Sequence, residues 1–392
     1  MDAVIVSGAR TPIGKFNKSL KSFSAPQLGA AVIREALARL GGKLEPKDVD
    51  EVIMGNVLTA GLGQAPARQA ALAAGFDYDI AAVTVNKVCG SGLKAVMLGA
   101  QAIRAGDAGI IVAGGQESMS NVPYYVPQAR FGHYYGNGVM IDGLEFDGLR
   151  DAYSGILMGI TGEIIAEKYQ INRETCDLFS LRSHQLSIAA RTKNWSQDEI
   201  APIKAPSGKV ENIITVDDGP RSDTNIQALS KLKPAFKDDG VVTAGNASSI
   251  NDGAAAVVLM SKERASEYGF EPQVTIKGYN TVGLKPELVM EAPIPGVKRL
   301  LQKLGLTIDD IDVVEHNEAF ASASIAVQRE LHVPEEDFNP RGGAIALGHP
   351  LGASGARILV TLISELRRRD AKRGLATLCL GGGNAVSMVV ER

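Results

Sequence analysis

At residues 83–96 the chain reads Val83-Thr84-Val85-Asn86-Lys87-Val88-Cys89-Gly90-Ser91-Gly92-Leu93-Lys94-Ala95-Val96, and the remaining sequence is arranged around this stretch. Its β-branched start predicts a buried strand, and its apolar end recurs at helical spacing. Cys89 therefore lies where a strand ends and a helix begins, and the unpaired N–H groups of that first helical turn favour a thiolate. The glycines leave room for another backbone or an acyl group beside the sulfur. The alternative is a buried small hydrophobe, because free cysteine is among the most buried residue types.

The composition is that of an ordinary globular chain, with 392 residues, 45% of them hydrophobic and 22% charged, and a net charge of −3. This charge gives no general electrostatic reason to expect nucleic acid or an anionic membrane as a partner. No apolar run approaches the ~20 residues that span a bilayer. The N-terminus enters a strand without a basic flank or a cleavable hydrophobic segment, so we expect a cytoplasmic protein. The three cysteines make no disulfide framework, and no Cys/His cluster indicates a metal site.

Strand-like and helical patterns alternate along both ends of the chain, which predicts an α/β fold with a parallel or mixed sheet covered on both faces. The second end repeats the order of the first. Residues 311–315 echo residues 49–53, and Ala353-Ser354-Gly355 echoes Gly90-Ser91-Gly92. The separations agree, since Val49 to Ser91 is 42 positions and Ile311 to Ser354 is 43. An internal duplication explains this order better than chance similarity does.

Residues 119–239 have a different texture and predict a loop domain inserted into the first half. The N-terminal α/β half then comprises residues 1–118 and 240–270, and the C-terminal half comprises residues 271–392. Two helices are expected between Gly159 and Ala190, and a strand over 210–216. A cluster of aromatic residues without clear periodicity begins this insert, and a contact with another subunit is favoured slightly over cover for its own domain; it comprises Tyr124, Tyr125, Phe131, Tyr134 and Tyr135.

Three reactive side chains stand next to glycines at loop or strand ends, where catalytic groups usually lie. Cys89 begins the helix of the first half, and His349, in Gly348-His349-Pro350-Leu351-Gly352, precedes the equivalent helix of the second half. Cys379 ends a strand and is followed by Leu380 and three glycines. Because duplicated sheets place equivalent strand ends side by side, a site between the halves would collect all three. The remaining histidines lack this setting: we expect His133, His184 and His332 on the solvated surface, and His316 to be a supporting group or a bystander.

Four separated motifs in this order resemble the thiolase family over essentially the whole chain, and most closely its acetyl-CoA C-acetyltransferase members. They are Val88-Cys89-Gly90-Ser91-Gly92, Asn317-Glu318-Ala319-Phe320, Gly348-His349-Pro350-Leu351-Gly352 and Cys379-Leu380-Gly381-Gly382-Gly383. The resemblance implies two similar halves in a five-layer αβαβα arrangement with an inserted loop domain. It also implies a homotetramer.

The resemblance further implies a reversible Claisen condensation of two acetyl-CoA into acetoacetyl-CoA and CoA. In this chemistry Cys89 is the nucleophile, deprotonated by His349, and becomes an acetyl thioester. Cys379 removes a methyl proton from the second acetyl-CoA, and His349 with a water held by Asn317 receives the enolate oxygen. The N–H groups of Cys89 and Gly381 receive the second oxyanion. No metal and no redox cofactor is called for, because the coenzyme A thioesters are substrates.

Coenzyme A binding is implied at further positions by the same resemblance. The nucleotide end would meet the loop domain at Arg221 and Thr224. The pantetheine arm would run along the loop after it, at Ala244 and Ser248. The acyl group would enter an apolar pocket lined by Leu149, Met158, Met290, Ala319 and Phe320. The competing interpretations are a solvated loop charge for Arg221 and ordinary core for Met158.

Two positions depart from the family's usual pattern. Leu157 stands where biosynthetic members commonly carry His, and His316 stands where many members carry Ala. Because residue 157 borders the acyl pocket, a broader 3-ketoacyl-CoA thiolase of fatty-acid degradation is the alternative function. A ketoacyl synthase would be expected to carry a second His where Cys379 stands, and a non-catalytic acyl-CoA-binding relative would be expected to have lost a reactive residue.

Overall fold

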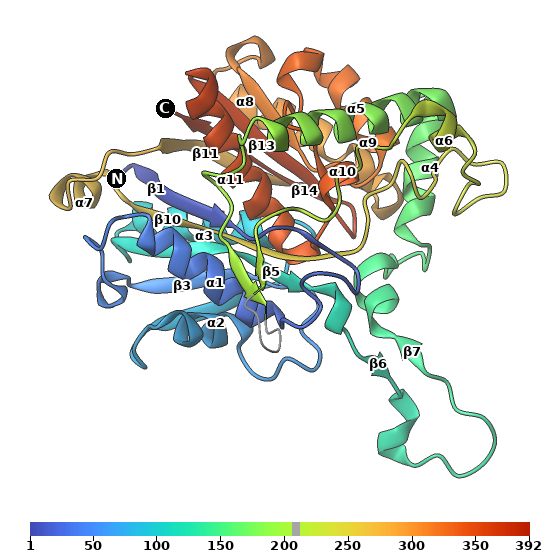
Figure 1. Cartoon of the computed structure of the whole chain (residues 1–392), viewed down its shortest axis with the longest axis horizontal. Helices are drawn as coiled ribbons and strands as arrows, with labels where there is room; N and C mark the ends of the chain where they lie inside the picture. Colours follow the sequence, from blue (N-terminus) through green and yellow to red (C-terminus); the bar gives the residue numbers. More distant parts are fainter. Residues whose placement is uncertain (206–211) are drawn as a thin grey trace.

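The computed structural model describes residues 1–205 and 212–392, and its centre is a mixed sheet of ten strands (Figure 1). The strands of the first half are β1 (Ala3–Arg10), β2 (Gly14–Lys15), β3 (Glu51–Gly55), β4 (Ala81–Val85), β5 (Ile110–Ser118) and β10 (Asn251–Ser261). Those of the second half are β11 (Val274–Gly283), β12 (Val313–His316), β13 (Arg373–Leu380) and β14 (Asn384–Glu391).

The two halves have the same strand order, which confirms the predicted duplication. The first half runs β3-β5-β10-β1 and the second runs β12-β13-β14-β11, with β4 added beside β3. The pairs β3–β5 and β12–β13 are parallel, and the pairs that follow, β5–β10 and β13–β14, are antiparallel. The halves join where β1 pairs antiparallel with β11, Val4 opposite Thr275 and Ile5 opposite Val274. The sheet is therefore mixed and continuous across both halves.

Helices cover the sheet in three layers, so the predicted αβαβα arrangement is confirmed. Helices α1 (Ala25–Ala38) and α2 (Pro66–Ala74) pack on the outer face of the first half, and α8 (Pro293–Leu304) and α9 (Ala321–Leu331) on that of the second. Between the halves lie α3 (Ser91–Ala105) and α11 (Leu351–Arg369), whose buried faces share one core with strands of both halves. The short helices α7 (Lys262–Glu267) and α10 (Ala344–Leu347) complete the two halves.

One sequence expectation about a strand is corrected. The run Val83–Val85 belongs to β4, which is an edge strand rather than a buried one, and Val83 is 41% exposed. Strand β5 runs through the paired glycines Gly114 and Gly115 and continues to Ser118. A β-carbon on Gly115 would lie 2.0 Å from the carbonyl oxygen of Gly352, so this glycine allows close backbone approach inside a strand.

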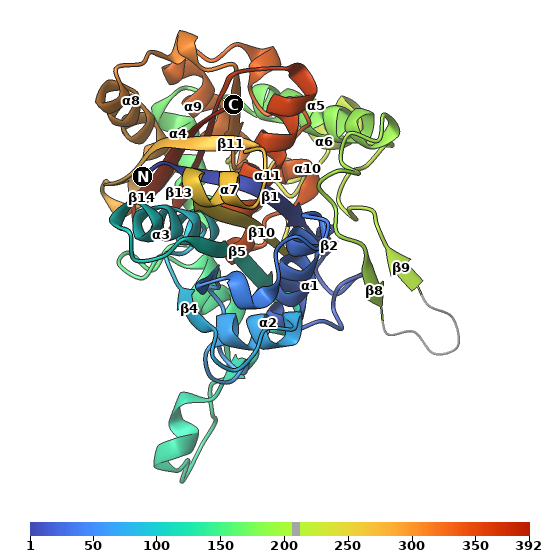
Figure 2. The same cartoon turned by 90° about the vertical axis from the view of Figure 1, so that its left-hand side faces the viewer.

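The segment 119–239 contains β6 (Tyr124–Tyr125), β7 (Ile141–Asp142), α4 (Met158–Lys168), α5 (Arg173–Thr192), β8 (Ile203–Ala205), β9 (Asn212–Ile214) and α6 (Ile226–Ser230). The two helices expected between Gly159 and Ala190 are thus present as α4 and α5. Of the strand expected over 210–216, residues 212–214 form β9, which pairs with β8 (Figure 2). Residues 210 and 211 lie outside the described residues.

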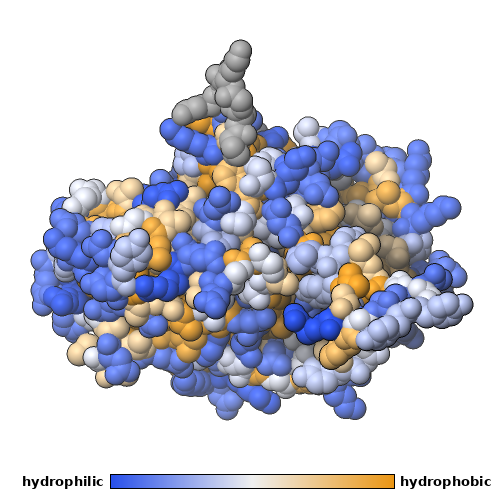
Figure 3. Space-filling model, turned by 90° about the horizontal axis from the view of Figure 1, so that it is seen from below, coloured by the Kyte–Doolittle hydropathy of each residue, from blue (hydrophilic) through white to orange (hydrophobic). Residues whose placement is uncertain are grey.

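The arm that carries β6 and β7 projects away from the body of the molecule (Figure 1). Its apolar side chains face solvent in this single chain, with Phe131 78% exposed, Tyr134 94% and Tyr135 98%. Orange apolar patches also interrupt the hydrophilic surface seen from below (Figure 3). Large exposed apolar groups gathered on one projection are typical of a surface that another chain covers. Among the described residues, no helix is both long and apolar enough to cross a membrane.

Candidate active site

Close contact between α3 and α11 brings Cys89 and His349 to the same place. A β-carbon on Gly92 would lie 2.9 Å from the carbonyl oxygen of Gly352, and one on Gly355 would lie 2.5 Å from the backbone nitrogen of Leu93. Gly92 and Gly355, each near the start of its helix, therefore let the N-terminal turns of α3 and α11 touch. The residues immediately before these turns face a common space.

That space is a cavity of about 700 Å³ between the two halves and the insert. It brings together eleven of the residues that the sequence assigned to catalysis and substrate binding. They are Cys89, Leu149, Met158, Ala244, Ser248, Met290, Ala319, Phe320, His349, Cys379 and Gly381. The lining is mainly apolar with a few reactive groups, which is the usual character of a small-molecule site.

Cys89 is half-buried, in a turn where Val88 has a left-handed backbone (φ 47°). The N–H of Gly381 and that of Cys89 itself both point to the sulfur and lower its pKa, yet burial outweighs them and the pKa rises to about 11. The expectation that the helix start yields a thiolate is therefore wrong for the free protein. Cys89 is a thiol at neutral pH, and its proton must be removed during the reaction. The two N–H groups are those assigned to the oxyanion.

Cys379 ends β13 and is buried, with its sulfur 3.7 Å from the sulfur of Met290. Burial, and then the proximity of Cys89, raise the pKa of Cys379 to about 12. A thiolate at this position would be a strong base, because it is short of solvation. The structure thus holds two thiols in one apolar cavity, and Cys89 is close enough to Cys379 to affect its ionisation.

His349 is held in the cavity by its backbone and its ring. Its N–H donates to Oδ1 of Asn251 at 3.0 Å, and its Nδ1 lies 2.6 Å from Oγ of Ser354. The amide nitrogen of Asn317 lies 3.4 Å from both ring nitrogens. Burial, together with the positive charge of Arg357, lowers the pKa of His349 to about 3. The imidazole is therefore neutral and ready to accept a proton.

Asn317 itself is not part of the cavity lining, although its side-chain amide contacts the ring of His349. Its backbone N–H donates to Thr377 on the neighbouring strand, which fixes its position after β12. Its Oδ1 is buried without a hydrogen-bond partner among the described residues. A buried amide oxygen with no protein partner can bind a water or a substrate group.

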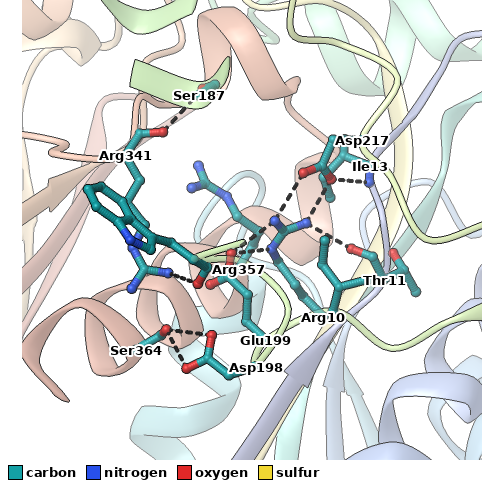
Figure 4. Close-up of polar contacts among 12 residues, drawn as sticks. Arg10, Thr11, Ile13, Ser187, Asp198, Glu199, Asp217, Arg341, Arg357 and Ser364 are labelled. Atoms are coloured by element: carbon teal, nitrogen blue, oxygen red, sulfur yellow. Dashed lines mark hydrogen bonds and ion pairs between the residues drawn. The ribbon is translucent and has the colours of Figure 1, made fainter. Parts of the chain in front are cut away.

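Arg221 and Thr224 lie outside the cavity lining, on the loop that follows β9. The guanidinium of Arg221 is exposed and pairs with Asp223 at 3.0 Å. The loop is fixed from below by Arg10, whose buried guanidinium donates to Glu199 at 2.9 Å and Asp217 at 2.7 Å (Figure 4). The exposed side chain fits the competing interpretation of Arg221 as a solvated loop charge, and it must leave Asp223 to reach a phosphate.

Three residues near the N-terminus line the cavity and escaped the sequence analysis: Lys15, Phe16 and Lys18. Their segment is tied to the Arg221 loop, because Asp218 accepts hydrogen bonds from the N–H of Lys15 and the hydroxyl of Ser19. Neither lysine has an ion pair among the described residues. The signal available in the sequence was two basic residues three positions apart, shortly after the first strand.

His184 is buried, not solvated as the sequence suggested. Its Nδ1 accepts the backbone N–H of Arg221 at 3.2 Å. Burial, followed by the positive charges of Lys15 and Arg221, lowers its pKa to about 4. Both Lys15 and Arg221 are thus near enough to this one imidazole to oppose its protonation.

Glu117, buried near the end of β5, supports the site and was not singled out in the sequence. Its buried carboxylate accepts hydrogen bonds from the side chain of Asn56 and the backbone N–H groups of Val57, Leu58 and Gly352. It thereby joins the loop after β3 to the first turn of α11, three residues after His349. The signal available in the sequence was a single acidic residue at the end of an otherwise uncharged strand.

His316 is fully buried, next to the apolar core under α8 and α9. Its Nδ1 lies 3.1 Å from Oγ of Ser324, and its ring stacks on Phe338 at 5.8 Å. These contacts give it a packing role. No group of three or more His, Cys, Asp or Glu side chains suited to a metal ion occurs in the described part of the chain.

Comparison with protein families matches residues 3–263 to the thiolase N-terminal domain and residues 270–392 to the thiolase C-terminal domain. The acetyl-CoA acetyltransferase of Pseudomonas aeruginosa is 52% identical over 392 residues, covering 100% of this chain and 99% of that protein. That of Escherichia coli is 50% identical over 392 residues, covering 100% and 99%. The crystal structure of the Bacillus anthracis acetyl-CoA acetyltransferase matches with a TM-score of 0.97 at 41% identity, covering 100% of this chain and 98% of that one.

Proposed function

The chain belongs to the thiolase family of acyltransferases, and from this membership we propose that it is an acetyl-CoA C-acetyltransferase. It joins two acetyl-CoA into acetoacetyl-CoA and CoA, and the reaction is reversible. The observation that carries the proposal is that one apolar cavity holds both cysteines and His349, with the N–H of Gly381 directed at Cys89. Two thiols and one base are what a two-step acyl transfer needs.

In the first step, His349 takes the proton of Cys89 as the sulfur attacks the thioester carbonyl of acetyl-CoA. The carbonyl oxygen gains negative charge and receives the N–H groups of Cys89 and Gly381. The C–S bond to CoA then breaks, and the departing thiolate takes the proton of Cys379. This leaves acetyl-Cys89, free CoA, a Cys379 thiolate and a protonated His349, so the charges balance.

In the second step, Cys379 removes a methyl proton from a second acetyl-CoA. The enolate oxygen receives Nε2–H of His349 and a water bound by Asn317. The enolate carbon attacks acetyl-Cys89, a C–C bond forms, and the C–S bond to Cys89 breaks. The Cys89 thiolate takes its proton back from His349, so both cysteines return to thiols.

Mass spectrometry tests the proposal directly. After incubation with acetyl-CoA, the acetyl group should be on the Cys89 peptide, and Cys89→Ala should carry none while remaining folded. Cys379→Ser should still be acetylated on Cys89, because that step needs only His349 as base and the CoA thiolate can leave and take its proton from water instead of Cys379. It should fail in condensation, because a serine hydroxyl is far too weakly acidic to serve as the base. Acetyl found on Cys176 or Cys379 instead would contradict the assignment of the nucleophile.

The remaining assignments are proposals of the same kind. Arg221 and Thr224 meet the nucleotide end of coenzyme A, Ala244 and Ser248 meet its pantetheine arm, and no metal or redox cofactor takes part. The exposed aromatic arm supports a homotetramer. The partners are therefore acetyl-CoA, acetoacetyl-CoA, CoA and copies of this chain, without nucleic acid or membrane, and the location is the cytoplasm. The Leu157 side chain in the cavity lining keeps a broader 3-ketoacyl-CoA thiolase as the alternative.

A further inference from the structure

His349 is the group on which both proposed steps depend, and a neutral imidazole carries only one ring proton. In the first step Nε2 must be free to take the Cys89 proton, so the resting proton must be on Nδ1. The buried ring cannot rely on solvent to choose between its two tautomers, so a neighbouring side chain has to do so.

Ser354, in the first turn of α11, is placed to make this choice. Its Oγ lies 2.6 Å from Nδ1 of His349 and 2.8 Å from the carbonyl oxygen of Pro350. A carbonyl can only accept, so the single hydroxyl proton is directed to Pro350. The Ser354 oxygen then presents a lone pair to His349, and Nδ1 must be the donor of the short contact.

The only other polar group at Nδ1 among the described residues is the amide of Asn317, whose nitrogen lies 3.4 Å away. An amide nitrogen donates and cannot accept, so it offers nothing to a protonated Nδ1. The same nitrogen is equally far from Nε2, across the ring, and therefore selects neither tautomer. Ser354 is buried in the first turn of α11, so its hydroxyl is held beside Nδ1 and favours the same tautomer throughout.

We propose that Ser354 is a positioning residue that keeps the proton of His349 on Nδ1 and thereby leaves Nε2 free as the base for Cys89. The proton on Nδ1 stays there, hydrogen-bonded to Ser354, through the whole cycle. Nε2 gains a proton in the first step and returns it in the second. The Ser354 oxygen also accepts from the ring while it is cationic, where burial and the nearby Arg357 oppose that charge. The role of Ser354 during the catalytic cycle rests on the proposed function, but the tautomer of His349 in the free protein does not.

Two measurements test the proposal. The first is nitrogen NMR of full-length protein labelled with [15N]histidine, with the His349 signals identified by their loss in His349→Asn. The wild type should show Nδ1 protonated and Nε2 unprotonated, and Ser354→Ala should show the reverse or a mixture. A wild type protonated on Nε2 overturns the proposal, whether or not the enzyme condenses acetyl-CoA.

The second measurement is the rate at which acetyl-CoA acetylates Cys89. In Ser354→Ala we expect a loss of about 10- to 100-fold with an unchanged KM, since a misplaced base forfeits part of the ~10²–10⁴ that general-base catalysis supplies. Ser354→Thr keeps the hydroxyl and should recover most of the rate. Ser354→Ala with the wild-type tautomer and rate would overturn the proposal. If wild type itself is not acetylated, the proposed function fails and the NMR result alone decides the tautomer.

Ser364→Ala is the matched control. Ser364 lies on the same helix, but its hydroxyl donates to Asp198 at 2.9 Å, away from the cavity. It should show the wild-type tautomer and acetylation rate. Melting temperatures of all variants separate a fold defect from a misplaced proton, because unfolding would lower the rate without changing the tautomer of the folded fraction.

Discussion

A β-carbon on Gly355 would lie 2.5 Å from the backbone nitrogen of Leu93, so α11 and α3 touch where only a glycine fits. Gly355→Ala should force the helices apart and cost about 1–3 kcal/mol of unfolding free energy, as overpacking does. The displacement lies between Cys89 and His349, so kcat should fall further than stability alone explains.

The measurements are a denaturant melt and kcat for condensation. Gly283→Ala is the matched control, because a β-carbon there meets no described atom within 4 Å and the backbone is not left-handed. Wild-type kcat in Gly355→Ala would show that helix contact does not set the Cys89–His349 geometry.

The ionisation of Cys89 gives a prediction about pH. Because burial raises its pKa to about 11, only about one part in 10⁴ is thiolate at pH 7, against a few per cent for an ordinary cysteine. The rate of alkylation by iodoacetamide in the free enzyme should therefore be low at pH 7 and still rise beyond pH 9. The control is free cysteine in the same buffers. A plateau below pH 8 would indicate a resting thiolate–imidazolium pair instead.

The duplicated fold and most of the site follow from local patterns in the sequence. Glycine positions, apolar periodicity and the repeated strand order are properties of short segments, and they placed Cys89, His349 and Cys379 at one junction. Edge and centre strands have similar compositions, however, so the residues of β4 predict a buried strand although β4 lies at the edge of the sheet. Whether a strand is covered depends on its neighbours in the sheet, which its own residues do not encode.

Burial was the other property that the sequence did not provide. The helix start suggested a low pKa for Cys89, but the cavity closes over the sulfur and desolvation wins. His184 appeared as an ordinary surface imidazole because its partner, Arg221, lies 37 positions away. Lys15 and Lys18 joined the site only through contacts of Asp218 that span about 200 positions.

Lys15 and Lys18 line the cavity and have no described ion pair, so we expect them to contact phosphates of coenzyme A. Exposed charge pairs are worth about 0.2–1 kcal/mol, so Lys15→Gln and Lys18→Gln should each raise KM for acetyl-CoA roughly 1.5- to 5-fold without changing kcat. The increase should shrink in high salt. Steady-state kinetics at two ionic strengths measures both effects.

Two controls sharpen this experiment. Lys21→Gln removes a charge from the same segment outside the cavity and should leave KM unchanged. The acetyl thioester of N-acetylcysteamine lacks the phosphates, so both lysine variants should use it as wild type does. An equal loss on both thioesters would mean that the lysines shape the cavity rather than bind phosphate.

The last prediction concerns Leu157, the N-cap residue of α4, which lines the cavity together with Leu149 and Met158. A histidine there would place a polar ring where leucine only packs, so Leu157→His should lower activity on six-carbon and longer 3-ketoacyl-CoA more than on acetoacetyl-CoA. One altered pocket contact is worth about 1–3 kcal/mol, which limits the change in the ratio of kcat/KM values to roughly 10- to 200-fold. Leu157→Met keeps the apolar character and should leave the ratio unchanged. Thermal melts accompany the kinetics: a lowered melting temperature with an unchanged ratio would mean that residue 157 supports the fold and does not select the acyl chain.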